Sequence, residues 1–167
     1  MKPKIVRAEE ENLIEIMFIL RECANDLIAK GYSHWNSAYP SHITILDDLK
    51  KQNLYLLKNF GGSIGTITLN NVQDPSYSQL KWSSDNHALI INRLAVHPVF
   101  QHKGYARMLM AFAEEFAHNE GYKSIRLDTF AGNEKTVHFF ESCGFAKVGE
   151  VSLSKDLNIY ACFEKQI

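Results

Sequence analysis

The chain has 167 residues, a formal net charge of −1, three cysteines and a composition that is 46% hydrophobic and 22% charged. These values favour one globular domain over residues 1–167 of a cytoplasmic protein with reduced thiols, because the cysteines are odd in number and lack metal-type spacing. They argue against a nucleic-acid partner and a membrane partner, since the charge is near neutral and no apolar stretch reaches membrane-spanning length.

The first third of the sequence predicts a strand, a long helix, an aromatic loop and a second helix. Residues 4–7 form the candidate strand, and residues 9–30 carry an amphipathic pattern. The predicted apolar stripe of this helix consists of Leu13, Met17, Leu20, Ala24, Leu27 and Ile28. Residues 31–40 then hold aromatic side chains without periodicity, which suits a hydrophobic plug and a ligand wall equally well. Ser41 is in place to cap a short helix.

A hairpin and a polar loop follow. Residues 54–57 and 64–69 are typical of strands, and the glycine pair between them predicts the turn of a hairpin. Residues 70–86 are polar, and loops of that length inside a compact domain are usually functional or partly disordered.

The next segment passes from a buried strand straight into a helix. Residues 89–96 are apolar enough for an interior strand, and helical spacing begins at Ala106. Between them, residues 101–106 read Gln-His-Lys-Gly-Tyr-Ala, with small residues at a helix N-terminus and positive charge from Lys103. Unpaired N–H groups and the helix macrodipole favour anions at such an end. Taken alone, the segment is equally consistent with a phosphate-binding loop and with an ordinary tight turn at Gly104.

The last third predicts a strand at residues 124–129, a helix at 133–143 capped by its first residue, and an antiparallel pair at 146–153 and 157–164. Because a helix separates the 124–129 strand from the preceding one, we expect these two strands to lie parallel and adjacent. The predicted class is α+β, with a mixed, mostly antiparallel sheet and one parallel pair at its centre.

Four stretches, in this order, resemble the GNAT superfamily of acyl-CoA-dependent N-acetyltransferases. They are Arg-Leu-Ala-Val-His-Pro at 93–98, Gln-x-x-Gly-x-Ala at 101–106, Arg-Leu-Asp-Thr at 126–129, and Asn-x-x-Thr-x-x-Phe-Phe-Glu-x-x-Gly-Phe at 133–145. The resemblance extends over essentially the whole chain, although only residues 93–145 carry sharp motifs. It implies an α/β/α sandwich whose central strand bulges and splays from its parallel neighbour, which opens a cleft for the pantetheine arm.

The resemblance also implies how acetyl-CoA or CoA would be held, with no metal. Strand main chain would hold the pantetheine, the N–H groups of residues 101–106 would bind the pyrophosphate, and the helix at residues 133–143 would flank the thiol. The implied cofactor-binding residues are Leu94, Ala95, Val96, Gln101, His102, Lys103, Gly104, Tyr105, Ala106, Asn133, Thr136, Phe139 and Phe140. Asn133 has the alternative of a simple helix cap, and Phe139 is expected to face the core.

Direct attack of an amine on a thioester requires a base and an oxyanion donor. The candidates for the base are His87, which could also be an ordinary surface histidine, and Asp128, which could also pair with Arg93 or Arg126 in a structural ion pair. The expected oxyanion donor is a strand N–H near Val96.

The leaving thiolate benefits from a proton donor. The family often supplies a tyrosine for this role at the position of Phe140, which has no proton to give. Tyr160 and water are the alternatives, and the step also proceeds without an acid if none is needed.

Trp35, Tyr39 and Asp128 are the candidate acceptor-binding residues, for a small amine, an amino-acid-like molecule or a peptide N-terminus. The sequence therefore predicts an acetyl-CoA-dependent N-acetyltransferase that works through a ternary complex, with a homodimer left open. A catalytically idle CoA-binding sensor or interaction module is the alternative that Phe140 keeps open. A nucleotide-phosphate binder unrelated to CoA is a third.

Overall fold

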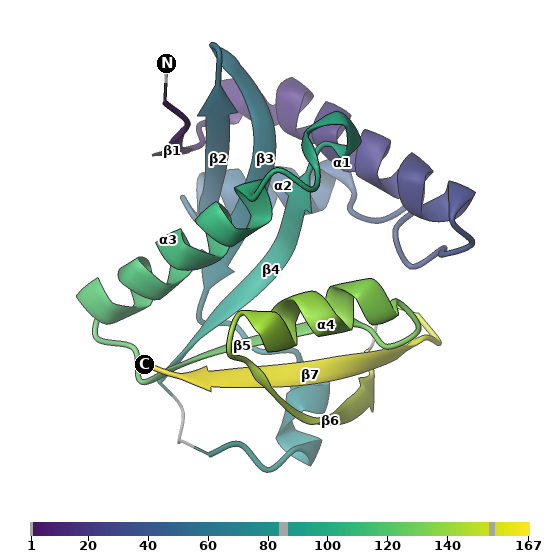
Figure 1. Cartoon of the computed structure of the whole chain (residues 1–167), viewed down its shortest axis with the longest axis vertical. Coiled ribbons are helices and arrows are strands. Elements are labelled where there is room, and N and C mark those ends of the chain that lie inside the picture. The colour runs from purple at the N-terminus through teal and green to yellow at the C-terminus, as the bar shows by residue number, and fades with distance from the viewer. Residues whose placement is uncertain (1, 84–86, 154–155) are drawn as a thin grey trace. The chain divides into compact units, whose positions relative to one another are not determined.

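The computed structural model of the chain describes residues 2–83, 87–153 and 156–167. Within these ranges the chain forms strands, α-helices and short 3-10 helices (Figure 1). The strands are β1 (Lys4–Arg7), β2 (Leu54–Asn59), β3 (Gly62–Asn70), β4 (Ala88–Val96), β5 (Ser124–Phe130), β6 (Ala146–Ser152) and β7 (Ile159–Gln166). The helices are η1 (Glu10–Asn12), α1 (Leu13–Ala29), α2 (His42–Lys50), η2 (Pro75–Gln79), η3 (Pro98–Phe100), α3 (Tyr105–Asn119) and α4 (Glu134–Ser142).

The strands form one mixed sheet of seven strands in the order β1-β2-β3-β4-β5-β7-β6. β4 and β5 are parallel and pair from Ala88↔Ser124 to Ile90↔Arg126, whereas β1–β2, β2–β3, β5–β7 and β6–β7 are antiparallel. The predicted mixed, mostly antiparallel sheet with a central parallel pair is therefore confirmed. The position of β7 between β5 and β6 is a feature that the sequence did not predict.

The chain divides into two compact units. The first unit comprises Met1–Leu69 and Arg93–Phe112, and the second comprises Asn70–Asn92 and Ala113–Ile167. β4 and α3 each contribute residues to both units.

In the first unit, α1 and α2 pack against each other beside the β1–β2–β3 strands. The core of this unit contains Ala8, Ile16, Ile19, Leu20, Cys23, Ile45, Leu49, Leu54, Leu56 and Ala95. The Ser41 hydroxyl accepts a hydrogen bond from the Thr44 N–H at 3.2 Å, which confirms the predicted cap of α2. The cap gives a hydrogen-bond partner to an N–H group that has none within the helix.

The side of α1 that meets the core is wider than the predicted stripe, of which Leu13 and Met17 pack partly buried against the core. Ile16, Ile19 and Cys23 are buried, although none of them belonged to the predicted stripe, and Ile28 is 49% exposed. Only Leu20 and Ala24 of the predicted stripe are fully buried. α1 is apolar on more than one side, so periodicity alone does not decide which side meets the core.

In the second unit, α4 lies over the strands β5 and β7 (Figure 1). The buried core on the sheet contains Tyr77, Ala88, Ile90, Val151, Leu153, Tyr160 and Cys162. Tyr77 comes from η2, so the polar segment 70–86 contains a 3-10 helix with a buried tyrosine; its residues 84–86 lie outside the described ranges. The segment between β6 and β7 likewise includes two residues, 154 and 155, outside these ranges.

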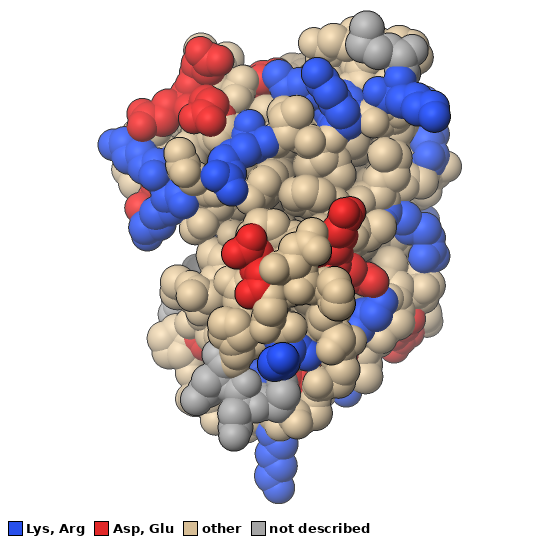
Figure 2. Space-filling model, turned by 90° about the vertical axis from the view of Figure 1, so that its left-hand side faces the viewer, with Lys and Arg blue, Asp and Glu red and all other residues tan. Residues whose placement is uncertain are grey.

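Side chains of both charges are spread over the face shown in Figure 2, in keeping with the near-neutral net charge. Among the helices of the described ranges, none combines the length and the apolarity that crossing a bilayer requires.

Candidate functional site

The predicted phosphate loop is exposed and has left-handed backbone at two alternating positions. His102 has φ 61° and Gly104 has φ 85°. Turns of this kind direct successive N–H groups to one side and form a concave anion site. A Cβ atom on Gly104 would meet no heavy atom within 4 Å, so the space above the glycine can accept a ligand. α3 begins at Tyr105, and the unpaired N–H groups of its first turn add to the same end.

Side chains anchor this loop to the first unit. Gln101 Nε2 donates to the Val96 carbonyl at 2.9 Å, and Asn59 Nδ2 donates to the Tyr105 hydroxyl at 2.9 Å. Gln101 and Tyr105 therefore support the loop through their side chains, whereas the predicted contribution to an anion comes from the main chain. Asn59 was missed by sequence reasoning, because nothing near it in the chain indicates its partner 46 residues away.

The end of β4 presents its main chain on the edge opposite β3. The His97 N–H donates to the Ile64 carbonyl of β3 at 2.9 Å. Because successive residues of a strand address opposite edges, the Val96 N–H is directed away from β3. The Val96 carbonyl accepts from Gln101 and, at 3.3 Å, from the thiol of Cys23. Burial raises the pKa of Cys23 to about 12, so this thiol stays protonated and able to donate.

Gly65 of β3 lets the two strands approach closely. A Cβ there would lie 2.9 Å from the Ala95 carbonyl oxygen and 3.4 Å from Leu109 Cδ1. Backbone cannot move aside as a flexible side chain can, so Gly65→Ala should shift β4. We expect this variant to lose about 1–3 kcal/mol of unfolding free energy, measured by urea denaturation. Gly62→Ala is the control, since its Cβ would meet only the Asn59 carbonyl at 4.0 Å. Equal stability of the two variants would contradict the close approach.

β4 departs from extended backbone at Arg93, which has φ 49° within the strand. The Arg93 guanidinium forms a salt bridge with Asp48 at 2.7 Å, and Arg126 forms one with Glu164 at 3.1 Å. Both arginines that were considered as partners of Asp128 therefore form salt bridges with other carboxylates.

Within residues 31–40, one aromatic side chain packs on the core and another takes part in a hydrogen bond. Trp35 packs against the core of the first unit, as a hydrophobic plug would. The Tyr39 hydroxyl instead accepts from Arg93 Nη1 at 3.3 Å. Asn36 shapes the loop, because its side-chain oxygen accepts from the N–H groups of Ala38 at 2.8 Å and Tyr39 at 3.2 Å.

In the second unit, Asp128 and Tyr160 lie on one face of the β5–β7 ladder. Asp128 is opposite Cys162, and Phe130 is opposite Tyr160. Directly opposed residues and residues two apart share a face of an antiparallel pair. The structure therefore brings together two of the three predicted catalytic residues.

Tyr77 covers Asp128 and was missed by sequence reasoning. Its hydroxyl donates to Asp128 Oδ2 at 2.6 Å. Burial, followed by the charge of Asp128, raises the pKa of Tyr77 well above its ordinary value, so the hydroxyl stays a donor. One sequence signal could have indicated Tyr77. It is an aromatic residue in a mostly polar loop, and it follows Asp74 and Pro75, residue types that start a helical turn.

Tyr160 is buried, and its hydroxyl donates to Asp156 Oδ2 at 2.5 Å. Burial and this carboxylate both raise the pKa of Tyr160. A phenol held in this way is a weaker acid than a free tyrosine.

Four predicted cofactor contacts lie on and before α4. Asn133 is the N-cap of this helix and accepts from the Thr136 N–H at 3.4 Å, as its alternative role required. Phe140, rather than Phe139, faces the core: it is 5% exposed, with its ring 6.1 Å from that of Phe163. Phe139, which was expected to face the core, is only half-buried.

His87 is exposed just before β4 and stacks on Tyr122 with ring centroids 4.8 Å apart. Nine residues of chain separate it from Val96, and a strand advances about 3.3 Å per residue. His87 is therefore a poor candidate for a base that acts on a thioester held at Val96.

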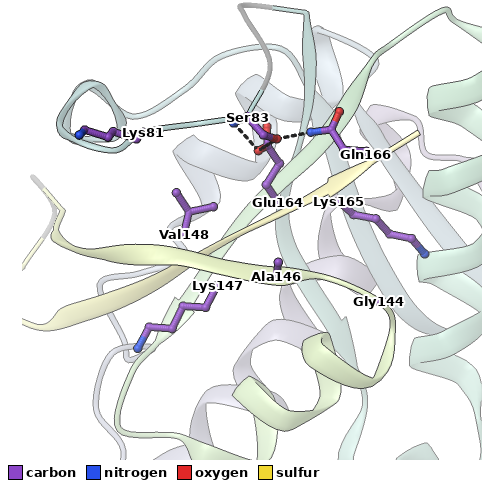
Figure 3. Close-up of a pocket in the computed structure, with 9 residues that line it drawn as sticks. All are labelled: Lys81, Ser83, Gly144, Ala146, Lys147, Val148, Glu164, Lys165 and Gln166. Carbon is purple, nitrogen blue, oxygen red and sulfur yellow. Dashed lines mark hydrogen bonds between the residues drawn. The ribbon is translucent and has the colours of Figure 1, made fainter.

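The second unit also contains a shallow hollow of about 510 Å³ along β6 and β7 (Figure 3). None of the predicted site residues lines it. Two of its lysines are paired with carboxylates, Lys147 with Glu150 at 2.6 Å and Lys165 with Glu114 at 2.7 Å. Its acidic residue, Glu164, accepts from Ser83. The hollow is therefore separate from the predicted chemistry. Across the described ranges, no group of three His, Cys, Asp or Glu side chains is arranged to hold a metal ion.

Comparison with known proteins identifies the class. The model of the acetyltransferase (GNAT) family matches residues 20–145, well over half of the chain. The chain belongs to the GNAT acetyltransferase family, as the sequence motifs predicted, and membership implies acyltransferase activity.

Individual relatives agree with this assignment. An uncharacterized N-acetyltransferase in the pepI 3′ region of Lactobacillus delbrueckii subsp. lactis is 29% identical over 154 residues, which covers 88% of this chain and 86% of that protein. A GNAT-family acetyltransferase from Streptococcus agalactiae has a similar structure, with a TM-score of 0.83, 23% identity and coverage of 99% of this chain and 95% of that one. The PaiA N-acetyltransferase of Thermoplasma acidophilum, solved in complex with coenzyme A, has a TM-score of 0.77 and 18% identity over 100% of both chains.

Proposed function

We propose that this chain is a single acetyltransferase domain over residues 1–167 that transfers an acetyl group from acetyl-CoA to a primary amine by direct attack in a ternary complex. The observation that carries the proposal is the exposed loop at the start of α3, with left-handed backbone at His102 and Gly104 and open space over the glycine. The relative with bound coenzyme A and the N-acetyltransferase relative support the donor and the type of acceptor.

In this proposal, the loop binds the CoA pyrophosphate through its N–H groups, and the main chain of Leu94, Ala95 and Val96 holds the pantetheine arm. The Val96 N–H, directed away from β3, is the proposed donor to the oxyanion of the tetrahedral intermediate. Asn133, Thr136, Phe139 and Phe140 remain the proposed neighbours of the thiol. The polar, open character of the loop fits a pyrophosphate, whereas the apolar β4 end fits the pantetheine arm.

A primary amine has a pKa near 10 and must lose a proton before it attacks. We assign this step to Asp128, the half-buried carboxylate that Tyr77 holds in place. Tyr160 is buried and its hydroxyl already donates to Asp156, so we assign protonation of the leaving thiolate to solvent.

Asp128→Asn should lower kcat by about 10²-fold, because it removes the base but keeps the shape of the side chain. Tyr77→Phe keeps the carboxylate and should cost much less activity. The measurement is the rate of CoA thiol release with acetyl-CoA and an amine, with folding checked by circular dichroism. Full activity of a folded Asp128→Asn variant would remove Asp128 from this role.

The function is tested by titrating acetyl-CoA into the protein and then screening amines, amino acids and peptide N-termini for release of free thiol. Trp35 and Tyr39 are the proposed wall of the acceptor site. Binding together with amine-dependent release supports the enzyme. Binding of acetyl-CoA without release of thiol for any amine supports the idle CoA-binding module. Phe140 favours this alternative, because its ring has no acidic proton to donate. Absence of binding would overturn both.

A further inference from the structure

Arg93 is in a conformation that its residue type disfavours. Four residues other than glycine have positive φ in the described part of the chain, and Gln52, Phe60 and His102 lie in turns. Arg93, with φ 49°, lies inside strand β4. The left-handed region brings the Cβ of an L-residue close to the following carbonyl oxygen. Such a residue persists only where its surroundings determine its conformation strongly.

The side chain of Arg93 provides that determination. Its Nε and Nη2 atoms donate to Asp48 Oδ2 and Oδ1, both at 2.8 Å, and the two side chains are only 11% and 7% exposed. Thr68 donates to the same carboxylate at 3.2 Å. Two parallel bonds between a planar guanidinium and a carboxylate fix orientation as well as distance. Asp48 sits on α2 and Thr68 on β3, so the fork ties β4 to two neighbouring elements.

A third hydrogen bond connects the Arg93 guanidinium to the aromatic loop, residues 31–40. Arg93 Nη1 donates to the Tyr39 hydroxyl at 3.3 Å. Tyr39 is held in turn by Asn36, whose carbonyl accepts from Arg21 of α1 at 2.7 Å. One guanidinium therefore joins the loop proposed for the acceptor to the strand proposed for the thioester.

Glycine would adopt φ 49° without strain, yet the chain has an arginine there. Glycine would also leave this point of the strand free to relax, since it has no side chain with which to hold it. The arginine side chain therefore holds the backbone in its left-handed conformation, which we call the bend of β4. The residues that follow the bend directly are Leu94, Ala95 and Val96.

We propose that Arg93 is a positioning residue. Its paired hydrogen bonds to Asp48 fix the left-handed backbone of β4, so that the main chain of residues 94–96 is presented to the acyl-pantetheine arm. Its bond to Tyr39 holds the acceptor loop in a fixed position relative to that main chain. This inference rests on the proposed function. It adds Arg93 and Asp48 to the proposed site and gives Tyr39, already proposed for the acceptor wall, a positioning contact. None of the three is assigned contact with the reacting atoms.

The test compares two ligands by calorimetric titration. Acetyl-CoA uses both the phosphate loop and the β4 main chain, whereas 3′-phosphoadenosine 5′-diphosphate, which lacks the pantetheine arm, uses the loop alone. Arg93→Lys keeps the charge beside Asp48 but loses the fork, and Arg93→Gly removes the side chain and relieves the backbone. Asp47→Asn is the matched control on α2, because it breaks the exposed pair with Lys51.

Both Arg93 variants should bind acetyl-CoA about tenfold more weakly than wild type, the equivalent of one or two lost hydrogen bonds, and should bind the nucleotide with unchanged affinity. Turnover should fall by as much as about 10²-fold, because a small misplacement of the thioester is costly in rate. Tyr39→Phe should change turnover and the KM of the amine but leave acetyl-CoA affinity intact. Asp47→Asn should change none of these.

A general loss of structure would weaken both ligands together, so the selective loss is the supporting result. Arg93→Lys is the decisive variant if the glycine variant does not fold. A folded Arg93→Lys protein with wild-type affinity for acetyl-CoA and wild-type turnover would overturn this inference alone. Wild type that binds no acetyl-CoA would overturn the proposed function, and this inference with it.

Discussion

Gly104→Glu should abolish measurable acetyl-CoA binding in a protein that remains folded. The new carboxylate would occupy the open space above the loop, where the pyrophosphate is proposed to lie, and would repel it. It would also compete for the N–H groups of the α3 N-terminus. Hydrogen bonds to a charged group contribute about 1.5–3 kcal/mol each, so loss of two of them weakens binding by at least about 10²-fold.

Gly121→Glu is the matched control for this variant. Gly121 has φ 77° and, like Gly104, nothing within 4 Å of the position of a Cβ, but it follows the C-terminal end of α3. The two variants therefore carry the same charge and a similar backbone cost. Calorimetry should show near-normal acetyl-CoA binding for Gly121→Glu. Equal affinities of the two variants would remove the phosphate site from the α3 N-terminus.

The elements of the fold were predictable wherever the determining residues are close in sequence. Ser41 caps α2 through Thr44, three residues away, and the left-handed Gly104 lies within the motif that indicated it. The parallel β4–β5 pair followed from the helix between them. In each case a local rule of backbone chemistry or connectivity was sufficient.

The partners of the site residues were not predictable, because they are set by packing between distant segments. Arg93 and Asp48 are 45 residues apart, and Tyr77 and Asp128 are 51 residues apart. From the sequence, Arg93 and Arg126 were the candidate partners of Asp128. No propensity rule predicts whether a carboxylate will meet an arginine or a tyrosine hydroxyl from a distant segment. Knowledge that β7 lies between β5 and β6 would have placed Glu164 opposite Arg126.

Glu164→Gln should be the most destabilising of the substitutions considered, at about 3–5 kcal/mol in unfolding free energy. Arg126 is 2% exposed and Glu164 is 4% exposed at their side chains, and Arg126 Nε donates to Glu164 at 3.1 Å. Removal of one charge leaves the other buried without its ion-pair partner, which costs far more than the loss of a surface pair. Glu150→Gln, which breaks an exposed pair with Lys147, should cost less than about 1 kcal/mol in the same urea titration.

The same pair should give the protein a specific sensitivity to acid. Burial by itself would raise the pKa of Glu164, but the bonds from Ser83 and Arg126 outweigh it and hold this pKa below its ordinary value. The ionised carboxylate therefore stabilises the fold above the ordinary pKa of glutamate, and this contribution is lost as the pH falls through the lower, folded-state pKa. As the pH falls below about 5, unfolding free energy should decline more steeply for wild type than for Glu164→Gln.

The double variant Arg126→Leu/Glu164→Leu separates the value of the pair from the cost of breaking it. If the charges mainly satisfy each other, removing both should recover much of the stability lost in Glu164→Gln, because no buried charge is left alone. If the double variant is as unstable as the single one, the energy must come from the other interactions of the two side chains. These are the bonds of Glu164 to Ser83, the bond from Arg126 to Gln73 at 2.6 Å and the stacking of Arg126 on Trp82 at 4.4 Å. The first outcome would show that apolar residues can replace the ion pair. The second would show that these two side chains fix residues 70–83 against β5 and β7. They would then also hold the Tyr77 hydroxyl on Asp128.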